Sequence, residues 1–142
     1  MKMGVLAAVI VLAIAAWLFL SRATFYTKYG TFAVSPEFTL TVSDNAGSHM
    51  PTFQIDRTSG GGGWGRDMVV TKPGDPFLLY WDDANKTLWW ATSAQLGYCR
   101  MEKGHSAASS VHARSEPLQD EDEFPDRPSV FVSEMERTLP VH

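Results

Sequence analysis

The side chains best suited to nucleophilic or metal chemistry lie in one stretch of the chain, at Cys99, His105 and His112. A cysteine nucleophile needs a nearby base and a third group that orients the base, and here only the candidate base, His105, is present. The spacing matches no common zinc pattern, and a single cysteine excludes sites built from two or four thiolates. A buried thiol with exposed histidines is therefore favoured. We expect no catalytic residue and no metal site.

A glycine-rich loop, Ser59 to Gly65, matches the spacing G-x-G-x-x-G at Gly60, Gly62 and Gly65. A dinucleotide fingerprint needs a helix after these glycines, because the helix N-terminus holds the pyrophosphate. Residues 67–71 resemble a short strand instead, and Arg66-Asp67 replaces the lysine and hydroxyl of a Walker loop. We predict a flexible hairpin loop and no cofactor, with a loop that closes over a ligand through Trp64 as the alternative.

Aromatic side chains are abundant, with five Trp, eight Phe and four Tyr. Large ring faces can form a platform for sugars or other flat ligands, although in a small domain they more often fill the core. Both interpretations stay open here. A binding platform would consist of Trp64, Tyr80, Trp81, Trp89 and Trp90.

Charge narrows the classes of partner. The chain holds 12 Lys and Arg against 16 Asp and Glu, a formal net charge of −4, which argues against nucleic-acid binding. Acidic residues concentrate in 116–126, without the glycine and spaced glutamate of a calcium loop. This block is interpreted as a solvated linker, or as a contact for a basic partner. Asn85-Lys86-Thr87 forms a glycosylation sequon at an expected turn.

The elements that position these residues are mostly strands. Alternation or short apolar runs predict strands over 31–34, 38–42, 52–57 and 67–71. The clearest element is a hairpin, in which 77–81 and 87–92 are joined by the loop 83–86. This loop pairs Trp81 with Leu88 and Leu79 with Trp90. Both faces of the hairpin are apolar, which indicates a position covered on two sides.

Composition changes after Met101. Residues 104–128 are rich in Ser and Ala and then acidic, and we interpret them as a linker. The tail 129–142 is predicted as a short element. It is either a helix, with Phe131, Met135 and Leu139 on one face, or an edge strand.

The first 20 residues decide the location. Residues 3–20 contain no charge, and 18 helical residues would be about 27 Å long, close to the ~30 Å core of a bilayer. Two interpretations compete: a retained signal anchor, or a signal peptide cleaved near Ala23. Aromatic residues at the membrane interface favour the anchor; they are Trp17, Phe25, Tyr26 and Tyr29. A buried helix of a soluble protein is the third possibility.

Together these features predict a mainly β protein: a small antiparallel sandwich or half-barrel of five to seven strands behind one N-terminal transmembrane or signal helix. The expected divisions are 1–23, 24–103, 104–128 and 129–142. The leading function is a non-enzymatic module, anchored in the bilayer through residues 3–20, that contacts other proteins outside the cytoplasm. The alternatives are secretion after cleavage, and a ligand- or glycan-binding β domain that uses the aromatic platform.

Overall fold

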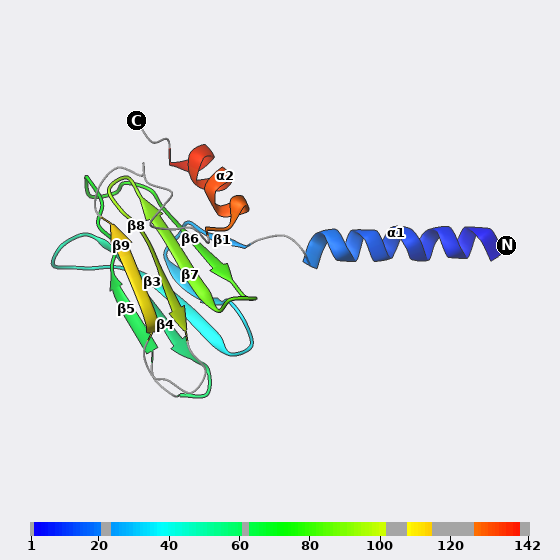
Figure 1. Cartoon of the computed structure of the whole chain (residues 1–142), viewed down its shortest axis with the longest axis horizontal. Helices are drawn as coiled ribbons and strands as arrows, with labels where there is room; N and C mark the ends of the chain where they lie inside the picture. The colour runs from blue at the N-terminus through cyan, green and yellow to red at the C-terminus, as the bar shows by residue number, and fades with distance from the viewer. Residues whose placement is uncertain (1, 21–23, 61–62, 102–107, 115–126, 140–142) are drawn as a thin grey trace.

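In the part of the chain that the structure describes, two helices and nine strands make the fold mainly β (Figure 1). The computed structural model describes residues 2–20, 24–60, 63–101, 108–114 and 127–139, and among these it does not describe the side chains of 2, 17–20 and 108–114. In chain order the elements are α1 (Lys2–Leu20), β1 (Phe25–Tyr26), β2 (Gly30–Ala33), β3 (Phe38–Asp44), β4 (Pro51–Arg57), β5 (Gly63–Asp67), β6 (Phe77–Asp82), β7 (Thr87–Thr92), β8 (Leu96–Met101), β9 (Ala108–Arg114) and α2 (Ser129–Thr138).

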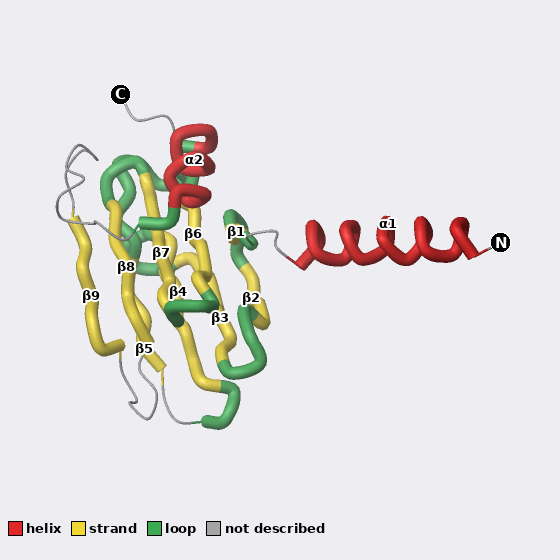
Figure 2. The backbone as a smooth tube through the Cα atoms, turned by 45° about the vertical axis from the view of Figure 1, so that its right-hand side comes forward, coloured by secondary structure: helices red, strands yellow, loops and turns green. Residues whose placement is uncertain are grey.

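The strands form two antiparallel sheets. One has the order β1-β6-β7-β8-β9 and the other the order β2-β3-β4-β5. The sheets face each other, as in a β-sandwich, with β1 and β2 at one open side and β5 and β9 at the other (Figure 2). The chain therefore enters the body from α1 at one side, and the last strand of each sheet lies at the opposite side.

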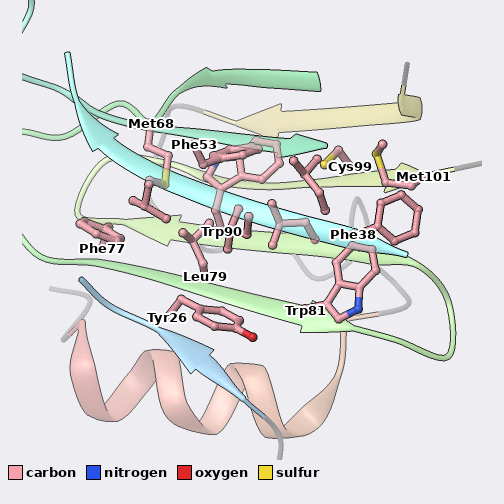
Figure 3. Close-up of a cluster of buried hydrophobic side chains, with 14 residues drawn as sticks. Tyr26, Phe38, Phe53, Met68, Phe77, Leu79, Trp81, Trp90, Cys99 and Met101 are labelled. Carbon is pink, nitrogen blue, oxygen red and sulfur yellow. The ribbon is translucent and has the colours of Figure 1, made fainter. Parts of the chain in front are cut away.

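Alternation of apolar and polar residues explains the core between the sheets. In β3 the side chains of Phe38, Leu40 and Val42 are buried, whereas those between them are half-buried or exposed. Phe53 and Ile55 of β4 repeat this pattern. Opposite them, the inward side chains of the other sheet complete one cluster (Figure 3), which includes Phe77, Leu79, Trp81, Leu88, Trp90, Cys99 and Met101.

A second core lies on the other face of the five-stranded sheet, beneath α2. Phe131, Met135 and Leu139 are buried there against the sheet residues Leu78, Trp89, Ala91 and Leu96. The spacing of the three helical residues confirms the predicted apolar face. The molecule thus has three layers: four strands, five strands and one helix.

The predicted hairpin is confirmed with its register. Trp81 pairs with Leu88 and Leu79 with Trp90 in the β6–β7 ladder. Lys86 in the connecting turn has a positive φ of 49°, which closes the tight loop. Both faces of the hairpin are covered, one by the second sheet and the other by α2.

Two elements differ from the prediction. The strand expected at 67–71 lies instead at Gly63–Asp67, because this segment, despite its glycines, pairs along β4 with Trp64 opposite Ile55. Residues 108–114, expected within a linker, form β9 because the free edge of β8 offers a ladder of backbone partners. Neither segment has the regular alternation of apolar and polar residues that identifies a half-buried strand in the sequence.

Helix α1 projects away from the sheets, and every side chain described in it, over residues 3–16, is exposed. The described part of the chain holds no helix that is both long and apolar enough to cross a membrane. The span expected for 3–20 is therefore not found: side chains are described for 14 residues of α1, 3–16, and at ~1.5 Å each these cover only about 21 Å. The side chain of Trp17 lies outside the description.

Candidate functional site

The thiol of Cys99 is sealed in the core between the sheets. Its exposed fraction is 0%, and burial raises the pKa of the thiol to about 12, since the thiolate would lose its hydration. A nucleophilic cysteine needs the opposite environment, which lowers the pKa and leaves the sulfur accessible. His105 and the side chain of His112 lie outside the description. Among the residues described, no group of three or more His, Cys, Asp or Glu is placed to hold a metal ion.

The five aromatic residues of the expected platform do not share one exposed surface. Trp81 and Trp90 are buried between the sheets, whereas Trp89 is buried beneath α2 with half-buried Tyr80 beside it. Neighbouring residues of a strand point to opposite faces, which places Tyr80 away from Trp81 and Trp89 away from Trp90. Trp64 is the remaining residue, half-buried at the open side of the sandwich. The indoles therefore act mainly as core.

Trp64 lies in a cluster of aromatic rings that also contains the guanidinium of Arg66. The ring of Trp64 lies 5.6 Å from that of Phe53 and 6.2 Å from that of Trp90. The guanidinium of Arg66 lies over the Trp90 ring, 5.5 Å from its centroid, in cation–π geometry. Trp64 and Arg66 are both half-buried, so this cluster reaches the surface along β5.

Strand β5 ends its sheet, and its outer edge has no paired strand in the described part of the chain. The direction of its backbone groups follows from one bond: the N–H of Met68 donates to the carbonyl of Pro51, 2.7 Å away. Successive residues of a strand turn their polar groups to opposite edges, so Trp64 and Arg66 bond to β4. The N–H and C=O groups of Gly63, Gly65 and Asp67 therefore point outward.

The glycines of β5 leave the outer face of this edge strand without a side chain at two positions. A Cβ at Gly65 would lie 2.6 Å from the carbonyl oxygen of Phe53, and one at Gly63 would collide with Ile55 and Asp56. Close approach of β4 thus requires glycine at both positions. As a result, two of the three outward-pointing residues carry no side chain that could shield the free backbone groups.

The end of β5 is fixed by side chains. The carboxylate of Asp67 accepts hydrogen bonds from the amide of Asn45, at 3.2 and 3.3 Å, and from the hydroxyl of Thr52. Beyond the strand, the N–H of Val69 donates to the side-chain carbonyl of buried Gln95, at 3.1 Å. These bonds hold the free edge in an extended, rigid form.

Two of the residues expected at a membrane interface lie in the first strand of the body, β1. Phe25 and Tyr26 form β1, where Phe25 packs on Tyr80 and Tyr26, only 9% exposed, packs on Phe32. Pairing with β6 buries Tyr26 in the core, which takes it away from lipid. Tyr29 is exposed and lies 5.6 Å from the Phe77 ring.

Comparison with family models, with curated proteins and with solved structures gives no match. The candidate site rests on its geometry: an edge strand fixed at its end by side-chain hydrogen bonds, outward backbone groups, and the half-buried side chains of Trp64 and Arg66. Sequence reasoning found Trp64 but missed Arg66 and the strand that holds both. The available signal was the alternation of Trp64 and Arg66 with glycines, which places the two large side chains on one face.

Proposed function

We propose that this protein is a membrane-anchored module that acts by contact with protein through the edge of its β-body. In this proposal α1 is the anchor and the body lies outside the cytoplasm. No catalytic role is assigned to it.

The exposure of α1 is the observation that carries the proposal. A helix that is apolar on every side is stable either inside a protein core or in a bilayer. The described side chains of α1 are all exposed to solvent, including Val5, Leu6 and Leu12. An amphipathic helix that lies on the membrane surface would need a polar face, which these residues do not offer.

The length of the apolar run also supports an anchor. It continues in the sequence through Leu20, which gives 18 residues and about 27 Å of helix. Helix α1 itself ends at Leu20. Small mismatches of this size with a ~30 Å hydrocarbon core are accommodated by modest thinning of the bilayer.

The body supports the contact role because both of its cores are complete without α1. Its catalytic candidate, Cys99, is buried, and its indoles fill the two cores. The remaining distinctive feature of the described body is the edge of β5, at the side opposite β1 and β2. A contact there would stay clear of the membrane to which α1 leads.

Fractionation of cells that express the full chain tests the anchor. We expect the protein in the membrane fraction, resistant to high salt and alkaline carbonate and released by detergent. Deletion of 3–20 is expected to move the body to the soluble fraction with its thermal unfolding unchanged. Recovery of the intact full chain in the soluble fraction would overturn the proposal.

Intact mass and N-terminal sequencing of the same material distinguish anchoring from secretion. A retained anchor leaves the chain beginning at Met1 or Lys2. Cleavage near Ala23 would leave Thr24 as the first residue and would release the body. Protease added to sealed cells or spheroplasts then reports the side of the membrane, and we expect the body to be digested.

A further inference from the structure

We infer that the partner at the β5 edge is a second copy of this chain, paired antiparallel through β5 so that the two four-stranded sheets join into one. This inference rests on the contact role proposed above, but not on entry of α1 into a membrane. The argument begins with the backbone groups of β5 and then uses its side chains to select the register.

The outward groups of β5 limit how two copies can pair. Gly63, Gly65 and Asp67 must face one another across the new ladder, because only their N–H and C=O groups point away from β4. Three registers pair at least two of these residues in each copy, with the two-fold axis at residue 64, 65 or 66. Each opposed pair of outward residues exchanges two backbone hydrogen bonds.

Side chains select the axis at Gly65. An axis at Arg66 places two guanidinium groups opposite each other, which is unfavourable. An axis at Trp64 leaves Asp67 beyond the paired region. An axis at Gly65 instead pairs all five residues of β5: Gly65 with Gly65, Gly63 with Asp67, and Trp64 with Arg66 of the second copy.

This register gives complementary contacts on the inward face. Trp64 and Arg66 of the second copy become a directly opposed pair without mutual hydrogen bonds, the type in which side chains approach most closely. A guanidinium over an indole face is attracted by the ring quadrupole, and symmetry produces this pair twice. Arg66 already lies over Trp90 within its own copy, so its charge is held at the face where the second indole arrives.

An inward-pointing charge at an edge strand usually prevents pairing, because it would be buried without a partner. At β5 the charge of Arg66 already lies over Trp90, and Trp64 of the second copy adds a further aromatic partner. The opposite face presents only Asp67 across from Gly63, so no like charges meet. About six backbone hydrogen bonds form, counting two for each of the three outward pairs.

This contact is small, since two five-residue strands alone give a weak interface. Pairing through β5 places the β2 strands of the two copies at opposite ends of the joined sheet. The β5 edge lies at the side of the body opposite β1 and β2, which leaves it accessible while the chain is anchored.

Spin labels on the outer face of the joined sheet test the inference. Thr31, Thr41 and Gln54 lie in one row across β2, β3 and β4, and Gln54 is paired with Gly65. At ~4.8 Å per strand, label sites in two copies are expected about 14 Å apart at Gln54→Cys, about 24 Å at Thr41→Cys and about 34 Å at Thr31→Cys. Cys99 is buried and stays unlabelled.

These distances are measured by dipolar electron paramagnetic resonance on the full chain in detergent solution, where the α1 helices of the two copies are not confined to one bilayer. The increasing order Gln54, Thr41, Thr31 supports pairing through β5. Absence of coupling at all three sites overturns the inference, and so does the reverse order, which places the contact at β2 or α1. Flotation of the same three variants with lipid vesicles reports the anchor separately.

A matched pair of variants tests the Trp–Arg contact. Arg66→Glu removes the cation from β5, and Arg57→Glu removes one that lies 5.1 Å from the Phe38 ring at the end of an inner strand. We expect Arg66→Glu to weaken association about tenfold, since two symmetric pairs are lost, and Arg57→Glu to change it less than about twofold. Equal effects of the two variants overturn the register. Should Arg66→Glu not fold, the label distances decide.

Discussion

At the scale of single residues, the core between the sheets contains a polar group that is satisfied from two directions. The side-chain carbonyl of Gln95, 2% exposed, accepts hydrogen bonds from the indole N–H of Trp90 and the backbone N–H of Val69, each at 3.1 Å. It thereby joins the largest buried side chain to the segment that follows β5. One buried acceptor thus links the core to the candidate edge.

Gln95→Met tests this link. The substitution keeps an unbranched side chain of similar size but leaves one buried donor, on Trp90, and one half-buried donor, on Val69, without an acceptor, each at a cost of ~1–3 kcal/mol. We expect the free energy of unfolding to fall by about 2–4 kcal/mol in denaturant titrations. The control is Gln54→Met on the exposed face, where the change is expected to stay within about 0.5 kcal/mol. Equal losses for both variants would contradict this role for Gln95.

Cys99 makes stability depend on alkaline pH. Burial raises its pKa from the ordinary 9.0 to about 12 in the folded protein, so the folded state retains the proton to higher pH than the unfolded state. The stabilisation is complete below pH 9 and is lost as pH rises from 9 towards 12. Unfolding free energies of the wild type and Cys99→Ala, measured from pH 7 to 11, should converge above pH 9. A constant difference would contradict the prediction.

At the scale of elements, α2 depends on the sheet beneath it. It has only ten residues and no side-chain hydrogen bond at its N-cap, and isolated helices of this length are marginal in water. Its stability comes from Phe131, Met135 and Leu139 in contact with the sheet. Tertiary contact thus decides that this segment is a helix and not the edge strand that its valines also permit.

Phe131→Ala should therefore release α2 from the sheet. The Phe131 ring lies 6.0 Å from the rings of both Tyr80 and Trp89, and its loss exposes that aromatic surface. We expect faster amide exchange throughout Ser129–Thr138 and a red shift of tryptophan emission, since Trp89 gains solvent. Val130→Ala is the control, because Val130 is 41% exposed on the same helix. Unchanged exchange in Phe131→Ala would show that α2 is held by other contacts.

At the scale of the whole molecule, the body and α1 are energetically separate. The described side chains of α1 contribute nothing to either core, whereas the sheets and α2 cover each other. A substitution in α1 should consequently change where the protein resides without changing how its body folds. This separation gives the proposed anchor a second test that retains the full length of the chain.

Leu12→Arg is the substitution of choice, because Leu12 is 68% exposed and lies in the middle of the apolar run. An arginine at the centre of an inserted helix costs ~2.5–3.5 kcal/mol. We expect a fall in the membrane-bound fraction, measured by flotation, with an unchanged melting temperature of the body. Leu12→Ala should behave as the wild type. A lowered melting temperature in Leu12→Arg would mean that α1 packs on the body.

Short-range patterns in the sequence were sufficient to predict part of the fold. Alternation located β3 and β4, the turn 83–86 set the register of the β6–β7 hairpin, and the spacing of Phe131, Met135 and Leu139 defined the face of α2. Each of these features depends on residues close together in the chain, whose geometry follows from local sterics and side-chain direction.

The position of β5, the existence of β9 and the separation of the indoles into two cores required the tertiary structure. Strands β5 and β9 exist because a neighbouring strand offers hydrogen-bond partners, not because their own residues favour extension. Likewise, each indole could face solvent or core until the second sheet and α2 were in place. The sequence by itself determined which side chains are apolar and prefer burial. Only the tertiary structure decided which side chains each of them contacts, because burial depends on contacts between distant parts of the chain.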